Sequence, residues 1–322
     1  MSSLQSFSLE NWDVIQVSGD DATSFLNNLL TVDVSKITLS NRLALGSDFL
    51  RLAAFCSSKG RVVASFWVSL HEFDTLGKSY FIWISKDIAY ELYIELKKYI
   101  FRSKVKIEYF DNKFKLIGYF STNKEEIIST SKNSGDISIF LPPVVDEGKE
   151  FYRLIKLVNS QNYETYKSLV GKNNLISQWN LLEIKSGIPR IVKKTSQIFI
   201  PQMINFESVH GIDFQKGCYP GQEIIARSQY RGTIKRRLKL AQFPTTDECK
   251  PSPGDLIYSN EDLNQPAGVV ILSEVNIKNL MFELQIEIKL EYISSLLVIN
   301  SNNIFSKAHL SVRDVPYSLL DI

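Results

Sequence analysis

The sequence predicts an α+β protein with antiparallel sheets, followed by a C-terminal all-β domain. Two observations lead to this prediction. Strand-like and helix-like segments in mixed order fill the first 120 residues, which is typical of α+β folds. After Thr233 the pattern changes to short strand-like segments joined by turns, at residue 257 and over 269–271, 280–290 and 296–298.

The pattern of the first 120 residues predicts an α+β part with antiparallel sheets and two helices. A short strand over 14–17 is followed by a turn at Ser18 and Gly19, and by a helix whose apolar side chains recur every three or four positions from Ala22 to Leu30. A turn over 57–60 joins two strands of a hairpin. The remaining predicted elements are an apolar run over 43–55 that turns strand-like, strands over 62–70, 81–84, 105–109 and 114–120, and a helix over 87–99.

The middle of the chain is less regular. Residues 121–150 are polar and rich in turns, and they predict surface connections around one helix and one strand. Helices are predicted over 163–170 and 178–186, and Gly187 with Pro189 ends the second. We therefore predict one region over 1–232, in two α+β parts (about 1–120 and 121–232), and a barrel-like β domain over 233–322.

Composition limits the function classes. Net charge is +2, so no global field demands nucleic acid or a membrane, and any anion site must be local. Three widely spaced cysteines and three histidines show no metal-ligand spacing and fit a reducing compartment. The N-terminus does not resemble a signal peptide, and no apolar run reaches the roughly 18 residues that a membrane span needs. We expect a cytoplasmic protein without a metal site.

The most chemically suggestive stretch runs from Lys216 through Cys218 to Arg227. Gly217 and Gly221 permit a tight turn. Pro220 suits the first position of a helix whose first turn would hold Gln222 and Glu223. A lysine two residues before the cysteine, and a helix N-terminus just after it, would favour the thiolate. The alternative is a buried cysteine in a tight turn, and the residue types alone do not decide between the two.

The string from Lys216 to Arg227, KGCYPGQEIIAR, resembles the signature of the YgfZ-type folate-binding proteins, which are relatives of the glycine-cleavage T-protein, an aminomethyltransferase. The resemblance covers roughly residues 8–240. Its further matches are Trp12, 19–22, 25–26, 30–34, 58–61, 96–99, 103–105, 187–189, 199–202, Asn205 and 230–232. It implies a T-protein-like fold around a tetrahydrofolate cleft. It also implies a link to iron–sulfur enzyme maintenance and to tRNA modification.

The resemblance also implies a set of site residues. Trp12 and Trp179 match tryptophans that these proteins are thought to use for folate, and Glu183 would hold the aminopyrimidine edge of the pterin. Taken alone, either tryptophan is more often a core residue. Cys218 and Lys216 would act at the reactive end of the folate. The other expected folate contacts are Tyr219, Gln222, Glu223 and Arg227.

Two features bear on the alternatives. T-proteins that transfer an aminomethyl group carry paired aspartates after the glycine of the first hairpin, and residues 60–65 here contain no carboxylate, which argues against that reaction. A basic run suggests contact with tRNA phosphates through Arg231, Lys235, Arg236 and Arg237, or else a solvated strand face. Three hypotheses follow: a folate-binding protein that supports iron–sulfur enzymes, a folate-dependent aminomethyl- or methyltransferase, and an RNA- or protein-binding scaffold without catalysis.

Overall fold

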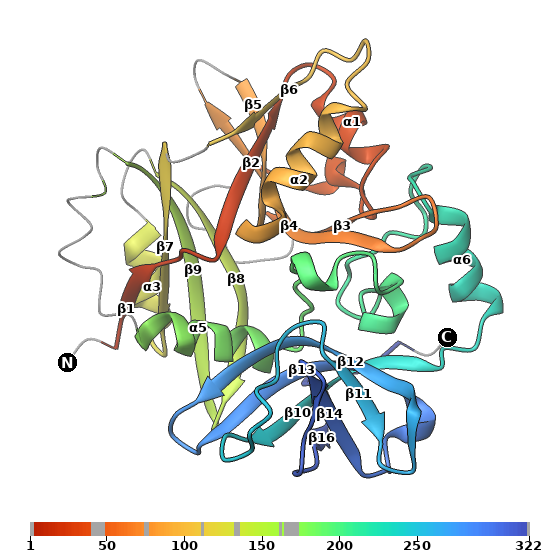
Figure 1. Cartoon of the computed structure of the whole chain (residues 1–322). Coiled ribbons are helices and arrows are strands. Elements are labelled where there is room, and N and C mark those ends of the chain that lie inside the picture. The colour runs from red at the N-terminus through yellow and green to blue at the C-terminus, as the bar shows by residue number, and fades with distance from the viewer. Residues whose placement is uncertain are drawn as a thin grey trace.

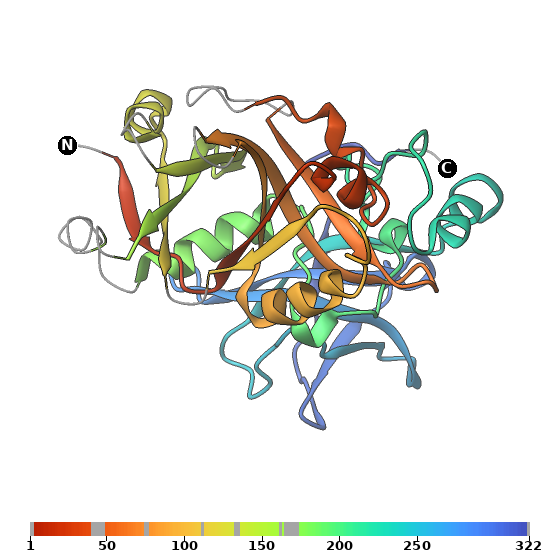
Figure 2. The same ribbon diagram turned by 90° about the horizontal axis from the view of Figure 1, so that it is seen from above.

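Three antiparallel sheets form the frame of the molecule (Figures 1 and 2). The computed structural model describes residues 3–39, 49–73, 77–110, 113–131, 136–160, 163 and 174–320. The strand orders are β3-β4-β5-β2-β6 in a five-stranded sheet, β1-β7-β9-β8 in a four-stranded sheet and β15-β14-β11-β12-β13-β10-β16 in a seven-stranded sheet. In Figure 1 the seven-stranded sheet lies below the other two.

The elements have the following bounds. The strands are β1 Gln5–Ser8, β2 Trp12–Ser18, β3 Leu50–Cys56, β4 Val62–Phe73, β5 Gly77–Ser85, β6 Lys106–Tyr109, β7 Phe114–Ser121, β8 Ile137–Asp146, β9 Lys149–Asn159, β10 Arg236–Pro244, β11 Leu256–Ser259, β12 Asp262–Asn276, β13 Met281–Lys289, β14 Leu297–Ser301, β15 Ile304–Phe305 and β16 Ser311–Arg313. The α-helices are α1 Ala22–Asn27, α2 Lys86–Lys97, α3 Lys124–Ser131, α5 Asn174–Lys185 and α6 Gln222–Arg231. Short 3-10 turns are η1 Val34–Lys36, η2 Lys193–Thr195, η3 Pro201–Ile204 and η4 Leu290–Tyr292.

The five-stranded sheet is covered on one face by α1 and α2. Their apolar residues, including Leu26 and Leu92, pack with Ile15, Phe66 and Ile82 into one core. The apolar side chains that recur every three or four positions in the sequence therefore face this sheet, as expected for amphipathic helices. The predicted strands and helices of the first 120 residues are present where the structure describes them, and residues 43–48 of the predicted apolar run lie outside the described residues.

A second core joins the five-stranded and four-stranded sheets. Trp12 and Trp83 on the first sheet pack with Phe120 and Ile155 on the second, and α5 adds Trp179. The helix α5 begins at Asn174, earlier than the predicted 178, and the helix predicted over 163–170 lies, apart from Tyr163, outside the described residues.

The seven-stranded sheet holds the end of α5. The Nε2 of Gln285 on β13 donates to the carbonyl oxygens of Glu183 and Ile184 at 3.2 Å and of Ile188 at 3.1 Å. Glu183 and Ile184 lie in the last turn of α5 and Ile188 follows the helix, so Gln285 adds a donor where the chain leaves α5 and the regular helix hydrogen bonds end. The side chain therefore fixes the angle at which the chain leaves α5.

The C-terminal sheet differs in one respect from the predicted barrel. Among the described residues, β15 and β16 stand at its two edges and do not pair with each other, so a closed barrel is not seen. The segment over residues 315–320 leaves β16 and returns to the middle of the molecule. There the hydroxyl of Tyr317 donates to the carbonyl of Gly187 at 2.8 Å, and Val315 enters the core around Phe206.

No helix in the described ranges is long and apolar enough to cross a membrane.

Candidate functional site

Trp12 and Glu183, two of the residues expected to bind folate, meet in one buried polar cluster. Trp12 opens β2 and is 5% exposed, and Glu183 on α5 is 6% exposed. Arg190 bridges them: its Nη2 lies 3.1 Å from Glu183 Oε2, and its guanidinium carbon lies 5.5 Å from the centre of the Trp12 ring. The Nη1 of Arg190 donates to Ser85 Oγ at 2.7 Å. An ion pair and a cation–π contact thus share one guanidinium.

Trp179 on α5 belongs to the same cluster. Its ring is 0% exposed and packs 5.5 Å from the guanidinium carbon of Arg153, a residue of β9. Burial lowers the pKa of Arg153 to about 10, while the charge of Glu183 acts in the opposite direction. Because Trp179 has no exposed surface, it offers no free face for stacking. Its ring contacts Arg153 and also Phe7, whose ring centre lies 5.6 Å away.

We define the Glu183 cluster as Trp12, Arg153, Trp179, Glu183 and Arg190. Each of these side chains has a buried polar atom without a hydrogen-bond partner in the described part of the chain: the two indole Nε1 atoms, the two arginine Nε atoms and Glu183 Oε2. Glu183 Oε2 lies within ion-pair distance of Arg190, yet it accepts no hydrogen bond. Buried polar groups in native proteins are nearly always paired, so such a concentration needs an explanation.

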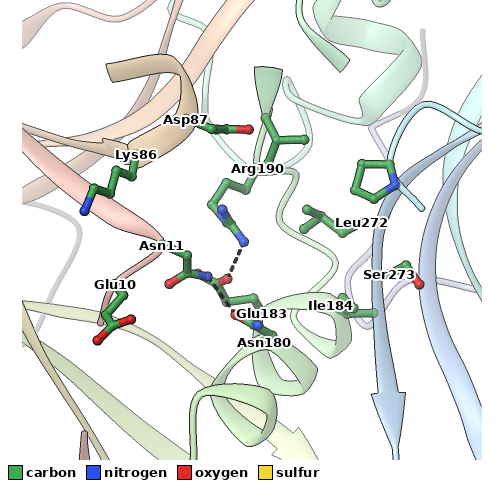
Figure 3. Close-up of a pocket in the computed structure, with 12 residues that line it drawn as sticks. Glu10, Asn11, Lys86, Asp87, Asn180, Glu183, Ile184, Arg190, Leu272 and Ser273 are labelled. Atoms are coloured by element: carbon green, nitrogen blue, oxygen red, sulfur yellow. Dashed lines mark hydrogen bonds and ion pairs between the residues drawn. The ribbon is translucent and has the colours of Figure 1, made fainter. Parts of the chain in front are cut away.

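Three adjoining cavities surround this cluster. The largest, of about 420 Å³, is lined by Glu183 and Arg190 together with Asn11 and Lys86 (Figure 3). A second, of about 280 Å³, shares Lys86 and adds Trp12, and a small one of about 20 Å³ lies between Trp12, Glu183 and Arg190. Volumes of a few hundred Å³ with a few polar groups are usual for small-molecule sites.

The cysteine loop forms a separate structure around Lys216. The Nζ of Lys216 donates to the carbonyl oxygens of Asn27 at 2.6 Å and Leu30 at 2.9 Å, at and just after the C-terminus of α1. It also lies 4.5 Å from the centre of the Tyr219 ring. Burial lowers the pKa of Lys216 to about 8, although the charges of Asp33, Asp213 and Cys218 raise it.

Of the two glycines expected to permit a tight turn, Gly221 has this role, whereas a Cβ at Gly217 would meet nothing within 4 Å. Gly221 has φ +80°, and a Cβ there would lie 2.5 Å from the carbonyl oxygen of Ser57 in the β3–β4 turn. The helix α6 begins at Gln222 with Gly221 as its N-cap, so Pro220 precedes the helix and is not its first residue. Cys218 is exposed, whereas Tyr219 is 7% exposed and burial raises its pKa.

The predicted site residues therefore fall into two groups. Gln222, Glu223 and Arg227 lie on α6, and α5 and α6 are on opposite sides of the molecule in both views (Figures 1 and 2). None of the residues from 216 to 227 lines the three cavities of the Glu183 cluster. Glu223 and Arg227 are exposed and Gln222 is half-buried.

The basic run needs a correction. Arg237 is 6% exposed and forms an ion pair with buried Glu207, so the predicted contact between Arg237 and RNA is wrong. Arg236 donates to both carboxylate oxygens of Glu287, at 2.8 and 2.9 Å, and its side chain is half-buried. Only Arg231 and Lys235 of the predicted four are exposed.

Sequence reasoning missed Arg153, Arg190 and Asn11. Arg153 had a usable signal, because it and Lys156 are the two cations among the aromatic and aliphatic residues from Phe151 to Val158, and a charge in a buried strand calls for a partner. Arg190 directly follows the Gly187–Pro189 match. Asn11 gave no signal, yet its Oδ1 is buried without a partner among the described residues.

No group of three or more histidine, cysteine or carboxylate side chains that could hold a metal ion is found in the described ranges. The Glu183 cluster instead suits a flat, polar organic ligand. It offers indole and guanidinium N–H donors beside a carboxylate acceptor.

Comparison with known proteins gives consistent relatives. No family model matches the chain. It is 33% identical over 247 residues to the tRNA-modifying protein YgfZ of Klebsiella pneumoniae (strain 342), covering 71% of this chain and 69% of that one. It is 31% identical to the protein of that name from Buchnera aphidicola subsp. Schizaphis graminum, over 79% and 77% of the two chains. A solved structure, the glycine cleavage system aminomethyltransferase T from Bartonella henselae, matches with a TM-score of 0.66 and 12% identity, covering 98% of this chain and 87% of that one, which shows the fold.

Proposed function

The chain belongs to the YgfZ family of tRNA-modifying proteins, and from that premise we propose that it binds tetrahydrofolate at the Glu183 cluster and supports tRNA modification. The finer parts of the proposal are a reactive Cys218 and a role in assembling or repairing iron–sulfur enzymes.

The set of unpartnered polar atoms carries the folate proposal. A pterin is flat, and its aminopyrimidine edge presents N–H donors beside an acceptor. Glu183 can accept from those donors, and the Nε of Arg190 and the Nε1 of Trp12 can donate to acceptor atoms of the ring. Leaving these groups unpaired costs about 1–3 kcal/mol each, so a ligand that pairs them gains affinity.

Each side chain has a distinct task in this proposal. Glu183 holds the aminopyrimidine edge, and Trp12 gives an aromatic face at the border of two cavities. Trp179 keeps Arg153 in place and so positions Glu183 indirectly. Tetrahydrofolate, when bound, supplies a carrier for one-carbon units. Tyr219, Gln222, Glu223 and Arg227 would contribute only if the ligand extended toward α6, so their part in folate binding stays a prediction.

Cys218 supports the second half of the proposal. It is an exposed thiol, and the nearby Lys216 is held by two backbone carbonyls. An exposed thiol can meet a sulfur atom or an iron–sulfur centre of a partner protein, as a nucleophile or as a ligand. Lys216 would position the loop and add positive charge beside the thiolate.

The two alternatives remain distinguishable. For aminomethyl transfer, β4 should supply a carboxylate near the ligand, but the cavity near Trp12 is lined there by Ser65, Phe66 and Trp67. A scaffold without a ligand would leave the polar atoms of the Glu183 cluster unexplained.

Calorimetric titration with tetrahydrofolate tests the proposal. Trp12→Phe keeps an aromatic ring but removes the indole N–H, and we expect roughly tenfold weaker binding for the loss of about one hydrogen bond. Glu183→Gln should weaken binding at least as much. Glu291→Gln, which changes an exposed carboxylate on η4, is the matched control and should bind like the wild type.

Two results would overturn the folate site. One is the absence of saturable binding by the wild type at folate concentrations near 1 mM, where the binding free energy is only about −4 kcal/mol. The other is equal affinity in all three variants. Cys218→Ala should bind folate normally yet fail to restore tRNA modification in cells that lack the native protein. Restored modification would remove the cysteine from the proposal.

A further inference from the structure

The loop after α2 presents an aromatic side chain to solvent under backbone strain. Phe101 is 90% exposed and has φ +38°, in the left-handed region that bulky residues rarely adopt. Such a conformation costs about 1–3 kcal/mol and gives no burial in return. Strain of this kind in an exposed phenylalanine points to a contact outside the chain.

Cations flank Phe101 on both sides in the sequence. Lys97, Lys98, Arg102 and Lys104 are all exposed, and no carboxylate occurs between residues 96 and 107. We call these four residues and Phe101 the Phe101 surface. Glu95 lies 2.5 Å from Lys98, and Asp20 lies 3.6 Å from Lys104. Exposed pairs of this type contribute about 0–1 kcal/mol, so an incoming anion can replace them.

Two of these cations have no acidic partner in the described part of the chain. The Nζ of Lys97 lies 5.1 Å from the centre of the Tyr93 ring and donates to the Tyr93 hydroxyl at 3.4 Å, and no ion pair is found for Arg102. Because the whole chain carries a net charge of only +2, this is a local positive patch and not the consequence of a basic protein.

The Phe101 surface and the Cys218 loop lie at opposite ends of α1. At one end, the backbone N–H of Lys104 donates to Asp21 Oδ2 at 2.7 Å. At the other end, Lys216 binds the carbonyls of Asn27 and Leu30. A six-residue helix is only about 9 Å long. In both views the loop after α2, α1 and α6 occupy the same side of the molecule (Figures 1 and 2).

We propose that the Phe101 surface binds single-stranded RNA, with a base stacked on Phe101 and phosphates held by Arg102, Lys97 and Lys104. Stacking on an exposed aromatic ring combined with cations is the usual way in which proteins hold single strands. An RNA strand that continued along α1 would reach the Cys218 loop, and Arg227 and Arg231 on α6 lie beyond it. The identification of the ligand as RNA rests on the proposed role in tRNA modification. The exposure and charge of the Phe101 surface are observed independently of that proposal.

Fluorescence anisotropy with a fluorescein-labelled single-stranded RNA and with a labelled tRNA tests this inference. Phe101→Asn removes the ring and places there a residue that tolerates positive φ, so the fold should be retained or stabilised while RNA affinity falls about tenfold. Arg102→Glu should also weaken binding about tenfold and lower the salt dependence by about 0.7 in the slope of log affinity against log salt.

Phe305→Asn and Lys307→Glu are matched controls. Phe305 on β15 is 41% exposed, and the side chain of Lys307, two residues after that strand, is 81% exposed; both lie in the C-terminal region and outside the Phe101 surface. They should leave RNA affinity unchanged. Absence of RNA binding by the wild type, or wild-type affinity in both Phe101→Asn and Arg102→Glu, would overturn the inference. Equal affinity for duplex RNA would overturn the stacked single strand.

Folate titration of the same samples separates this inference from the proposed function. Phe101→Asn should bind tetrahydrofolate like the wild type. If the wild type binds no folate but binds RNA in a Phe101-dependent way, the folate site fails and the RNA surface stands. If the wild type binds folate but binds no RNA, the folate site stands and the RNA surface fails.

Discussion

Glu183→Gln offers the sharpest test of the buried cluster, because it keeps the shape of the side chain and removes its charge. Glu183 is the carboxylate that lies against Arg190, and its charge also acts on Arg153. The side chain of Glu183 is 7% exposed and that of Arg190 is 14% exposed. Substitution therefore leaves two buried guanidinium groups without their counter-charge.

The expected loss of stability is large. At an effective dielectric constant of about 20, unit charges 3.1 Å apart attract by about 5 kcal/mol. Desolvation offsets part of this attraction, and removing one partner of a buried pair usually costs about 3–5 kcal/mol. We expect a decrease of about 3 kcal/mol in the free energy of unfolding. For a chain of 322 residues that corresponds to a decrease of about 4 °C in Tm.

Differential scanning calorimetry at neutral pH measures this change, with Glu291→Gln as the control for loss of an exposed carboxylate. Tetrahydrofolate at one fixed concentration should raise the Tm of Glu183→Gln less than that of the control, because the variant binds the ligand more weakly. A decrease in Tm below about 1 °C, or one equal to that of Glu291→Gln, would show that Glu183 does not neutralise the two arginines.

Three further predictions concern the cysteine loop and the C-terminal sheet. Gly221→Ala should lower the free energy of unfolding, measured by urea titration, by about 3 kcal/mol, because φ is positive there and the new Cβ overlaps with Ser57. Gly217→Ala is the control and should be neutral, because no atom lies within 4 Å of its new Cβ. Equal effects of the two substitutions would contradict the turn geometry. Arg237→Met should lower the free energy of unfolding by about 3–5 kcal/mol, because Glu207 is then buried without its ion-pair partner. A loss below about 1 kcal/mol would argue against a stabilising ion pair between Arg237 and Glu207. The pKa of Lys216 falls from 10.5 to about 8 on folding, so between these pH values the folded chain binds fewer protons than the unfolded chain, and the free energy of unfolding should rise with pH. Lys216→Met should lose that rise. An unchanged pH profile of stability in this variant would refute the pKa shift.

Periodicity in the sequence predicted most of the fold because its cause is local. The apolar spacing in α1 and α2, and the turn between β3 and β4, each lie within about a dozen residues and match the structure. The family resemblance gave the T-protein-like arrangement, which the structural match confirms. Spacing alone would not have ordered the three sheets.

The Glu183 cluster could be predicted only in part because it depends on distant pairing. Trp12 and Glu183 came from the resemblance, but Arg153 and Arg190 act only once β9 and the chain after α5 pack together. The basic run shows a second limit. Register on β10 turns Arg237 toward Glu207, and a count of cations cannot reveal which face of a strand each one occupies.

The return of residues 315–320 to the middle of the molecule has a consequence for synthesis of the protein. This segment supplies the carbonyl of Leu320 to Arg237 and the hydroxyl of Tyr317 to Gly187, yet the ribosome makes it after every element that it contacts. A nascent chain would hold the junction between α5, η3 and β10 open, with apolar surface uncovered, until this segment emerges. Chaperone binding and aggregation of the nascent chain should therefore be most frequent just before residues 315–320 are made and packed.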